Sequence, residues 1–344
     1  MRIKKTLMVL RLKFIVCALS FLATACLFPG RGVAAEQAAP AKLAVLVVFD
    51  QLRGDYLSRW DRLFGPDGFH RIEKEGVWFT NCHYPYAYTV TGAGHASLTT
   101  GTWPSEHGII GNEWFDRATG DEAGCVAVGR YTRVPPKPGA EASRTSVTSL
   151  AKTSVSPERL LVPNVADALK DATGGNGKVV SLSFKDRSAV LPGGKRPDAC
   201  YWFDTSAGIF VTSTYYREKP HAWVDAFNKS RIADKWFSMN WDRLRTDVDY
   251  ESLSGPDDVI GEGRGQAQGR TFPHPMHGGD SKPGSRYNQA LYNSPFGNEL
   301  LCSLAAWAVD AENLGNGDAP DLLCLSFSCN DTIGHIWGDR KSVV

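Results

Sequence analysis

The sequence lacks the patterns that would place it directly in several common protein classes. None of its eight cysteines forms a Cys-x-x-Cys pair, which argues against a zinc ribbon. After residue 35, no apolar run approaches the roughly 20 residues that a transmembrane helix needs. Internal repeats and long low-complexity segments are also lacking. The apolar fraction of 42% is sufficient for a substantial core, so we expect a folded chain without a membrane-spanning segment after residue 35.

The first 35 residues differ from the rest of the chain. Basic residues within positions 2–13 precede an apolar run from Phe14 to Phe28, and a Val-Ala-Ala segment follows at 33–35. This order is typical of a secretory signal with a small-residue cleavage site. Cys26 is instead a candidate for a lipid-anchored cysteine, and both possibilities stay open. We therefore expect a periplasmic or secreted protein, free or lipid-anchored, with residues 1–35 as its signal.

Removal of this segment would reverse the sign of the net charge. Six of the 38 basic residues precede Glu36 and no acidic residue does, which leaves 32 basic and 37 acidic residues, a net charge of −5. A protein that binds nucleic acid without sequence preference would carry the opposite sign, so nucleic acid is not an expected partner. Six cysteines follow residue 35, and their 15 possible pairings into three disulfides stay open.

Three continuous apolar runs predict strands that are buried on both faces. These runs are Leu43 to Phe49, Lys178 to Phe184 and Asp321 to Ser328. Helical patterns precede the second and third runs, at Asn164 to Ala172 and at about Asn298 to Leu314, and clustered glycines follow each pattern. The alternation of helix and strand predicts an α/β fold with a mainly parallel sheet flanked by helices.

Residues 205–296 have a different composition. Tyrosine, tryptophan and turn residues dominate this region, and it contains a glycine-rich stretch from Gly261 to Gly269. Long segments of this kind within a compact domain are usually functional. We expect a large insertion, outside the core sheet, that covers the functional site as a cap.

Polar residues follow each predicted strand. Asp50 follows the first strand, Lys185 and Arg187 follow the second, and Asp331 follows the third. Ligands of open α/β sheets bind at the carboxyl ends of the strands, so we expect these four side chains to share one crevice. Carboxylates suit metal cations, whereas lysine and arginine suit phosphate.

Two further segments add candidate chemistry. His335 lies four residues after Asp331, which places both side chains on one helix face. This spacing alone is more often structural, but its position after a strand favours a metal site.

Thr91 precedes a Gly-Ala-Gly segment at the expected start of a helix, where backbone N–H groups favour an anion. Thr91 is therefore a candidate nucleophile, with helix capping as the alternative; His95 and His107 are interpreted as packing or loop-ordering residues.

Five ordered motifs together resemble the bacterial alkaline phosphatases that use threonine as nucleophile. These enzymes belong to the superfamily that also contains the nucleotide pyrophosphatase/phosphodiesterases. The motifs are Phe49-Asp50, Thr91-Gly92-Ala93-Gly94-His95, His107 to Asn112, Phe184-Lys185-Asp186-Arg187 and Ser326 to His335. The resemblance begins at about Leu43, and it implies an alkaline-phosphatase-like fold in which residues 36–344 form a partial catalytic domain.

The resemblance also implies a role for each candidate residue. Thr91 would attack phosphorus and become a phosphothreonine, which a zinc-bound hydroxide then hydrolyses. The implied metal ligands are Asp50 and Thr91 for one zinc ion, and Asp331 and His335 for the other. The implied ligands of the non-bridging phosphate oxygens are Asn112, Lys185 and Arg187.

Small-molecule phosphate esters are the implied substrates. A monoester carries two negative charges and a diester carries one, so the pair Lys185 and Arg187 favours a phosphomonoesterase. A phosphodiesterase or nucleotide pyrophosphatase of the same superfamily is the alternative. The sulfatase branch needs a Cys or Ser in a C/S-x-P-x-R context, which the sequence does not contain.

The resemblance implies three further metal ligands, an Asp-His pair and a later His, downstream of the Asp-x-x-x-His motif. The sequence ends nine residues after His335. Two explanations stay open: the sequence is a truncated part of a longer protein with the C-terminal part of the fold missing, or the protein is a non-catalytic relative. We expect low or no activity from residues 1–344 alone.

Overall fold

The computed structural model describes residues 41–137 and 155–338. The predicted signal segment and Cys26 lie outside these residues, and both expectations stay predictions. None of the helices in the described ranges is both long and apolar enough to cross a membrane.

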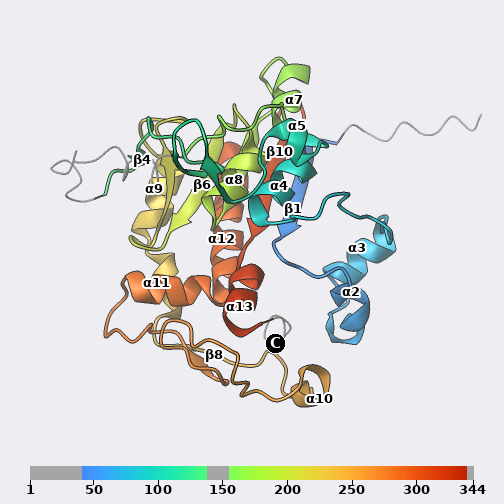
Figure 1. The fold of residues 1–344 in the computed structure, drawn as a ribbon, viewed down its shortest axis with the longest axis vertical. Helices are drawn as coiled ribbons and strands as arrows, with labels where there is room; N and C mark the ends of the chain where they lie inside the picture. The colour runs from blue at the N-terminus through green and yellow to red at the C-terminus, as the bar shows by residue number, and fades with distance from the viewer. Residues whose placement is uncertain (1–40, 138–154, 339–344) are drawn as a thin grey trace, which may run out of the picture. The chain divides into compact units, whose positions relative to one another are not determined.

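A six-stranded sheet forms the centre of the described chain (Figure 1). Its order is β1-β10-β5-β6-β7-β4, in which β1, β10, β5 and β6 are parallel and β7 and β4 are antiparallel to their neighbours. The strands are β1 (Leu43–Phe49), β4 (Arg133–Val134), β5 (Val179–Ser183), β6 (Ala199–Asp204), β7 (Ile209–Ser213) and β10 (Asp321–Phe327). The predicted mainly parallel sheet is confirmed, and its three predicted strands are β1, β5 and β10.

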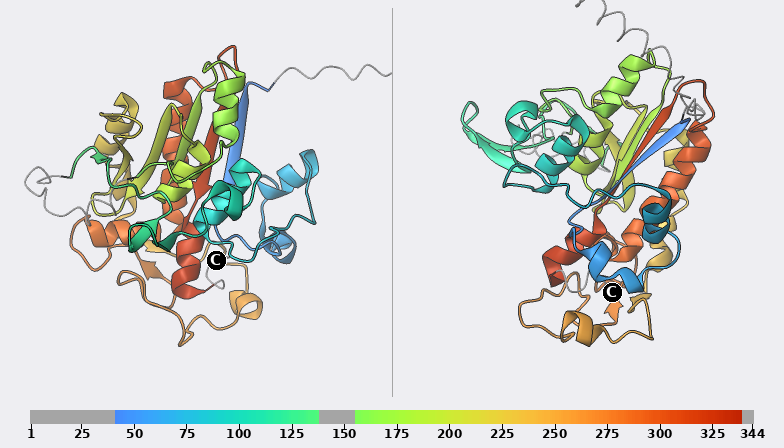
Figure 2. Two further views of the ribbon diagram at one scale, coloured as in Figure 1. Left: turned by 45° about the horizontal axis from the view of Figure 1, so that its top comes forward. Right: turned by 90° about the vertical axis from the view of Figure 1, so that its right-hand side faces the viewer.

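Helices cover the two faces of the sheet. The right view of Figure 2 shows the green and teal helices on one face and the orange α12 on the other. The helices of these layers are α4 (Thr91–Thr100), α7 (Val165–Ala172), α8 (Asp186–Gly193), α9 (Ala222–Lys229) and α12 (Pro295–Glu312). β5 shows why both faces must be apolar: Val180 and Leu182 join the cluster with α12, whereas Val179 packs with α7.

Both predicted helices are present with small shifts at their ends. Asn164 caps α7, because its side chain accepts from the Asp167 backbone N–H while the Asp167 carboxylate accepts from Asn164, a reciprocal capping box. α12 begins at Pro295, three residues before the predicted start, with proline at its first position where no N–H is needed.

β1 differs from the prediction of a strand buried on both faces. It is an edge strand of the described sheet, with β10 as its neighbour, and Val45 and Val47 are 50% and 43% exposed. A continuous apolar run does not distinguish a central strand from an edge strand, because both need at least one covered face. β5 and β10 are buried at every position, as predicted.

The region predicted as a cap is partly core, which corrects the expectation for residues 205–296. β7 pairs with β6 through a tight turn at Gly208, so the first part of this region extends the sheet. Helices α9 and α11 (Ser285–Tyr292) contribute buried Phe227, Tyr287 and Leu291 to the core. The aromatic composition reflects this packing, because tyrosine and phenylalanine bury large apolar areas.

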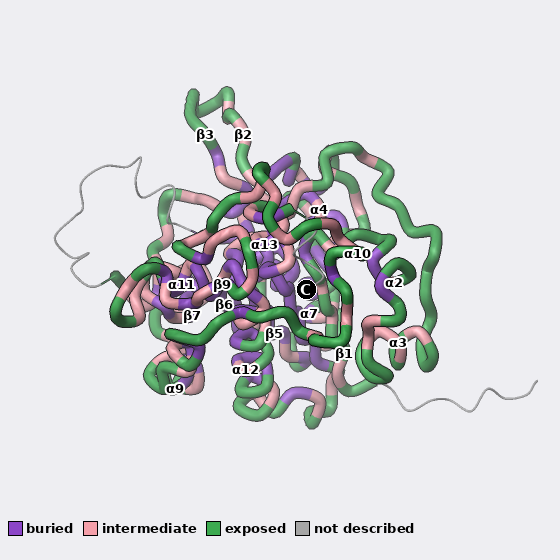
Figure 3. Tube along the Cα trace, turned by 90° about the horizontal axis from the view of Figure 1, so that it is seen from below, coloured by how far each residue is buried: buried purple, intermediate pink, exposed green. Residues whose placement is uncertain are grey.

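The remaining elements are short and lie around the sheet. Within residues 205–296 they are η3 (Ile232–Trp236), β8 (Asn240–Trp241), α10 (Tyr250–Ser254) and β9 (His274–Pro275). The others are α2 (Tyr56–Arg59), η1 (Asp61–Leu63), α3 (Phe69–Glu75), α5 (Pro104–His107), β2 (Glu113–Asp116), β3 (Asp121–Gly124) and α13 (Cys329–Trp337). Figure 3 shows the β2–β3 hairpin projecting with mostly exposed residues.

Candidate active site

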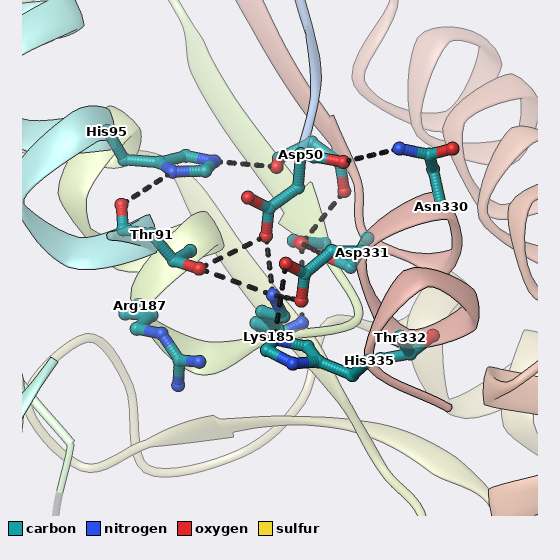
Figure 4. Close-up of polar contacts among 12 residues, drawn as sticks. Asp50, Thr91, His95, Lys185, Arg187, Asn330, Asp331, Thr332 and His335 are labelled. Carbon is teal, nitrogen blue, oxygen red and sulfur yellow. Dashed lines mark hydrogen bonds and ion pairs between the residues drawn. The ribbon is translucent and has the colours of Figure 1, made fainter. Parts of the chain in front are cut away.

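The carboxyl ends of three parallel strands bring the predicted residues together (Figure 4). Asp50 directly follows β1, Lys185 follows β5 at the start of α8, and Asp331 lies in the first turn of α13 after β10. β1, β10 and β5 are adjacent in the sheet, so their ends meet at one edge. The expected crevice is present, although the roles of its residues stay predictions.

Lys185 lies between the two carboxylates. Its Nζ donates to Asp50 Oδ2 at 2.5 Å and also to Asp331 Oδ2. The side chains of all three residues are at most 9% exposed. Two negative charges that converge out of water need a compensating cation, and the ammonium supplies it here.

Thr91 is the first residue of α4, as predicted, and its hydroxyl points into this cluster. Thr91 Oγ1 donates to Asp50 Oδ2 at 3.3 Å and lies 3.3 Å from the Lys185 ammonium, which donates to it. No side chain caps α4, whose N-cap residue is Val90. The capping interpretation of Thr91 is therefore wrong, and the hydroxyl is available where the helix N-terminus favours an anion.

Asn112 is fixed beside Thr91 by the next residue of α4. The Gly92 N–H donates to Asn112 Oδ1 at 2.7 Å, so the amide NH2 group must point the other way. Gly92 has to be glycine, because an added Cβ would lie 2.8 Å from the Gly111 carbonyl oxygen. No described residue accepts a hydrogen bond from the Asn112 NH2 group, which can therefore donate to an anion at Thr91.

Arg187 brings a second cation to the same side of the cluster. It is the second residue of α8, its side chain is 27% exposed, and Asp186 lies 3.8 Å from its guanidinium. Its buried Nε has no hydrogen-bond acceptor among the described residues. A buried donor without a partner is costly, so this atom favours an anionic ligand.

Asp331 and His335 share one face of α13, as their spacing predicted. His335 Nε2 lies 3.5 Å from Asp331 Oδ1, and the imidazole is 72% exposed. Asp331 points to Lys185, and the His335 imidazole lies next to Asp331 at the exposed rim of the cluster (Figure 4). The pair is placed for joint metal binding but does not enclose a site alone.

The two other histidines near Thr91 are held by hydrogen bonds inside the protein. His95 lies 2.8 Å from both the Thr91 carbonyl and Ser326 Oγ. His107 accepts from the Ile109 N–H and lies 2.9 Å from Ser97 Oγ. Burial lowers the pKa of both imidazoles, which keeps them neutral and supports their interpretation as packing residues.

Several residues that support the site were not identified from the sequence. Asn330 donates to the Asp50 carbonyl at 3.1 Å, and Ser326 holds His95. The Gln51 amide donates to Asp331 Oδ1 at 3.2 Å when its NH2 group faces the carboxylate. The sequence offered one signal for these residues, which is their position at the ends of predicted strands. They are Gln51, Ser326 and Asn330.

Cysteine chemistry does not compete with this site. The six cysteines after residue 35 all lie in the described ranges and carry free thiols. Burial raises the pKa of Cys125, which lies beside Gly92, to about 12. A protonated thiol is a poor nucleophile, so the half-buried Thr91 hydroxyl is the better candidate.

The donor types at the site suit a divalent metal, but their number is low. Asp50 with Thr91 and Asp331 with His335 each supply two donors, whereas catalytic zinc usually has three protein ligands. No group of three or more His, Cys, Asp or Glu side chains with metal-binding geometry occurs in residues 41–137 and 155–338. The described residues therefore fit part of a two-metal site, with the Lys185 ammonium in the space between the carboxylates.

Comparison with known proteins identifies the family. The sequence profile of the type I phosphodiesterase/nucleotide pyrophosphatase family matches residues 44–343. The chain is 34% identical over 307 residues to alkaline phosphatase PhoV of Synechococcus elongatus, covering 89% of this chain and 53% of PhoV. It is also 34% identical over 303 residues to alkaline phosphatase PafA of Elizabethkingia meningoseptica, covering 87% of this chain and 52% of PafA.

The solved structures agree with the sequence comparison. The crystal structure of wild-type PafA superimposes with a TM-score of 0.78 at 34% identity, covering 89% of this chain and 57% of that one. The chain spans about half the length of the curated relatives it matches. The resemblance to bacterial alkaline phosphatases is confirmed, and the chain belongs to the type I phosphodiesterase/nucleotide pyrophosphatase family.

Proposed function

We propose that this protein hydrolyses phosphate monoesters with Thr91 as nucleophile. The observation that carries this proposal is the position of the Thr91 hydroxyl at the start of α4, 3.3 Å from both Asp50 Oδ2 and Lys185 Nζ. A carboxylate that accepts the hydroxyl proton and a cation that favours the alkoxide together activate a threonine. The similarity to PhoV and PafA, both named alkaline phosphatases, supports the same reaction class.

The residues around Thr91 fit the charges of the reaction. Thr91 Oγ1 forms the new bond to phosphorus, the bond to the leaving oxygen breaks, and water later cleaves the phosphothreonine. The Asn112 NH2 group and the Arg187 guanidinium lie beside Thr91 and would hold the non-bridging oxygens. Arginine forms a planar fork that matches phosphate geometry, whereas Lys185 adds a point charge.

Divalent metal ions would be held by Asp50 with Thr91 and by Asp331 with His335. When bound, such ions neutralise charge on the attacking and leaving oxygens, and the family resemblance suggests zinc. Because the described residues supply two donors for each ion, we expect slow turnover by this chain. Single-turnover assays, with protein in excess over a chromogenic monoester, are suited to a slow reaction.

A phosphodiesterase activity is the main alternative, since the matching family profile is named for it. Charge discriminates between the two reactions. A monoester dianion needs both Lys185 and Arg187, whereas a diester monoanion needs less compensation. We expect Arg187→Ala to lower monoester turnover by about 10- to 100-fold, the effect of one lost charge-assisted hydrogen bond, and diester turnover by less.

The experiment compares p-nitrophenyl phosphate with bis(p-nitrophenyl) phosphate for the unsubstituted protein, Lys185→Ala and Arg187→Ala. The exposed Arg71, which pairs with Glu75 on α3, provides the control substitution Arg71→Ala. Equal losses on both esters would reject the monoesterase assignment. Undiminished monoester turnover by Thr91→Ala would reject Thr91 as nucleophile.

We also propose that residues 1–35 export the protein to the periplasm or the exterior. The basic-then-apolar order of this segment supports export. Cell fractionation of the tagged full chain, compared with a chain that starts at Glu36, tests this proposal. Equal amounts of both chains in the cytoplasmic fraction would contradict it.

A further inference from the structure

A pocket of about 730 Å³ borders His335. One wall is the glycine-rich loop of residues 261–266, and the other walls come from α13 and the end of α11. His335 is common to the pocket and the active site, because it lines the pocket and its Nε2 lies 3.5 Å from Asp331 Oδ1, and Asp331 contacts Lys185.

The loop that forms the wall is held in place by buried contacts. The Gly263 N–H donates to the Ile336 carbonyl at 2.6 Å, which ties the loop to α13. Gln268, 1% exposed, donates to the Ala290 carbonyl, and its backbone N–H donates to the Arg264 carbonyl. The pocket wall is therefore preorganised by α13 and α11.

Gly265 shows how closely the loop approaches α13. Its φ is +51°, and an added Cβ would lie 3.1 Å from the Trp337 ring and 2.5 Å from Gln268 Oε1. The Trp337 indole N–H also donates to the Gly269 carbonyl at 2.9 Å. These contacts fix the backbone on both sides of Arg264 and so fix where its side chain starts.

The charge of this pocket is positive. Arg264 is an exposed lining residue, and its guanidinium has no ion-pair partner within the described ranges. The other lining side chains near it are uncharged amides and a hydroxyl, such as Gln266, Gln289 and Thr332, and none of the described lining residues is a carboxylate. Both carboxylate oxygens of the neighbouring Glu262 are buried. An unpaired guanidinium among amides suits a carboxylate or phosphate group.

A second pocket on the Arg187 side has the opposite character. Its volume is about 450 Å³, and Asn112 and Arg187 form part of its wall. Its lining carboxylates outnumber its guanidinium groups. The carboxylates belong to Glu113, Asp121, Glu122 and Asp186, and the guanidinium groups belong to Arg159 and Arg187. An anionic leaving group would meet repulsion there and attraction beside Arg264.

We propose that the pocket between loop 261–266 and α13 holds the leaving group, and that Arg264 selects leaving groups that carry a second anionic group. This inference rests on the proposed function. In an in-line displacement the leaving oxygen departs opposite the nucleophile. A metal ion held by Asp331 and His335 would supply charge compensation for such an oxygen, and His335 also lines the pocket. The substrate class is therefore phosphorylated acids and bisphosphates rather than esters of neutral alcohols.

Two esters of equal length provide the test. 3-Phosphoglycerate and glycerol 3-phosphate share a three-carbon leaving group, and they differ by a carboxylate in place of a hydroxymethyl group. The measured quantity is the ratio of kcat/KM for the first ester to that for the second. We expect Arg264→Gln to lower this ratio by about tenfold, the effect of one charge-assisted hydrogen bond in an open pocket.

The matched control is Arg270→Gln, which removes an arginine of the same segment that pairs with Asp258 at 2.7 Å and does not line the pocket. This control should leave the ratio unchanged. Calorimetric binding of both esters to the Thr91→Ala protein, with and without Arg264→Gln, measures the same selectivity without turnover.

The outcomes separate the two proposals. If the protein cleaves glycerol 3-phosphate and Arg264→Gln has the same kcat/KM ratio for the two esters as the unsubstituted protein, the leaving-group pocket is overturned. The proposed function then still stands. If the unsubstituted protein cleaves neither ester and its Thr91→Ala variant binds neither, the proposed function fails as well. A falling ratio in Arg264→Gln, together with an unchanged ratio in Arg270→Gln, supports both.

Discussion

Removal of the Lys185 charge should destabilise the metal-free protein more than any other lysine substitution at a strand end. The ammonium is shared by Asp50, at 2.5 Å, and Asp331, and all three side chains are at most 9% exposed. Lys185→Met keeps the length of the side chain but leaves two buried carboxylates without their common partner. Breaking a buried pair costs about 3 to 5 kcal/mol, and we expect about 3 kcal/mol because Asp50 also accepts from Thr91.

Urea unfolding at neutral pH in the presence of a chelator measures this loss. The control is Lys229→Met, because Lys229 is 75% exposed and pairs with Asp225 on the surface of α9. Its expected effect is below about 0.5 kcal/mol. If both variants shifted the unfolding midpoint equally, the Lys185 ammonium would not be compensating buried charge, and the reasoning would be refuted.

The same variant tests competition between the ammonium and a metal ion. The ammonium occupies carboxylate oxygens of Asp50 and Asp331 that would each help to hold a metal ion, so Lys185→Met should bind zinc more tightly than the unsubstituted protein does. Zinc should also raise the unfolding free energy of Lys185→Met by more than it raises that of the unsubstituted protein. Calorimetric titration measures the affinity, and equal or weaker binding by Lys185→Met would contradict the competition.

Two further predictions concern the support of the site. Gly92→Ala should lower the unfolding free energy by about 1 to 3 kcal/mol in urea, because its Cβ would lie 2.8 Å from a backbone oxygen of Gly111 that cannot easily move. A change within the error of the wild-type midpoint would contradict this steric argument. Burial lowers the pKa of His107 from its usual 6.5, so the unfolded state binds the proton first as the pH falls. The contribution of His107 to stability should be complete above pH 6.5 and decline below it, and a His107→Asn variant with the same pH dependence as the wild type would exclude His107 as the cause.

Much of the central sheet could be predicted from the sequence. β5 and β10 are covered by helices on both faces, so every position except Asp321 at the start of β10 is apolar or small, and these runs can be recognised in the sequence. The burial of β1 could not be predicted, since the apolar run does not report how many neighbours a strand has. β7 was missed because it is short and pairs with β6 across a tight turn in an aromatic region.

The candidate site, like the sheet, could be predicted only in part from the sequence. Positions at strand ends predicted that Asp50, Lys185 and Asp331 would meet, because the rule depends on topology. The sequence did not indicate that Lys185 would contact both carboxylates, which lie 135 and 146 residues away along the chain. The pocket at Arg264 was also missed, because it depends on packing of the loop against α13 and carries no motif.

The identity of the phosphorylated residue decides whether Thr91 is the nucleophile. The protein is mixed in excess with a phosphate monoester and zinc, quenched in acid before the intermediate hydrolyses, digested and analysed by mass spectrometry. We expect one added phosphoryl group on the peptide that contains Thr91, and none on that peptide from Thr91→Val. Substrate turnover without a phosphorylated Thr91 peptide, or undiminished turnover by Thr91→Val, would contradict it.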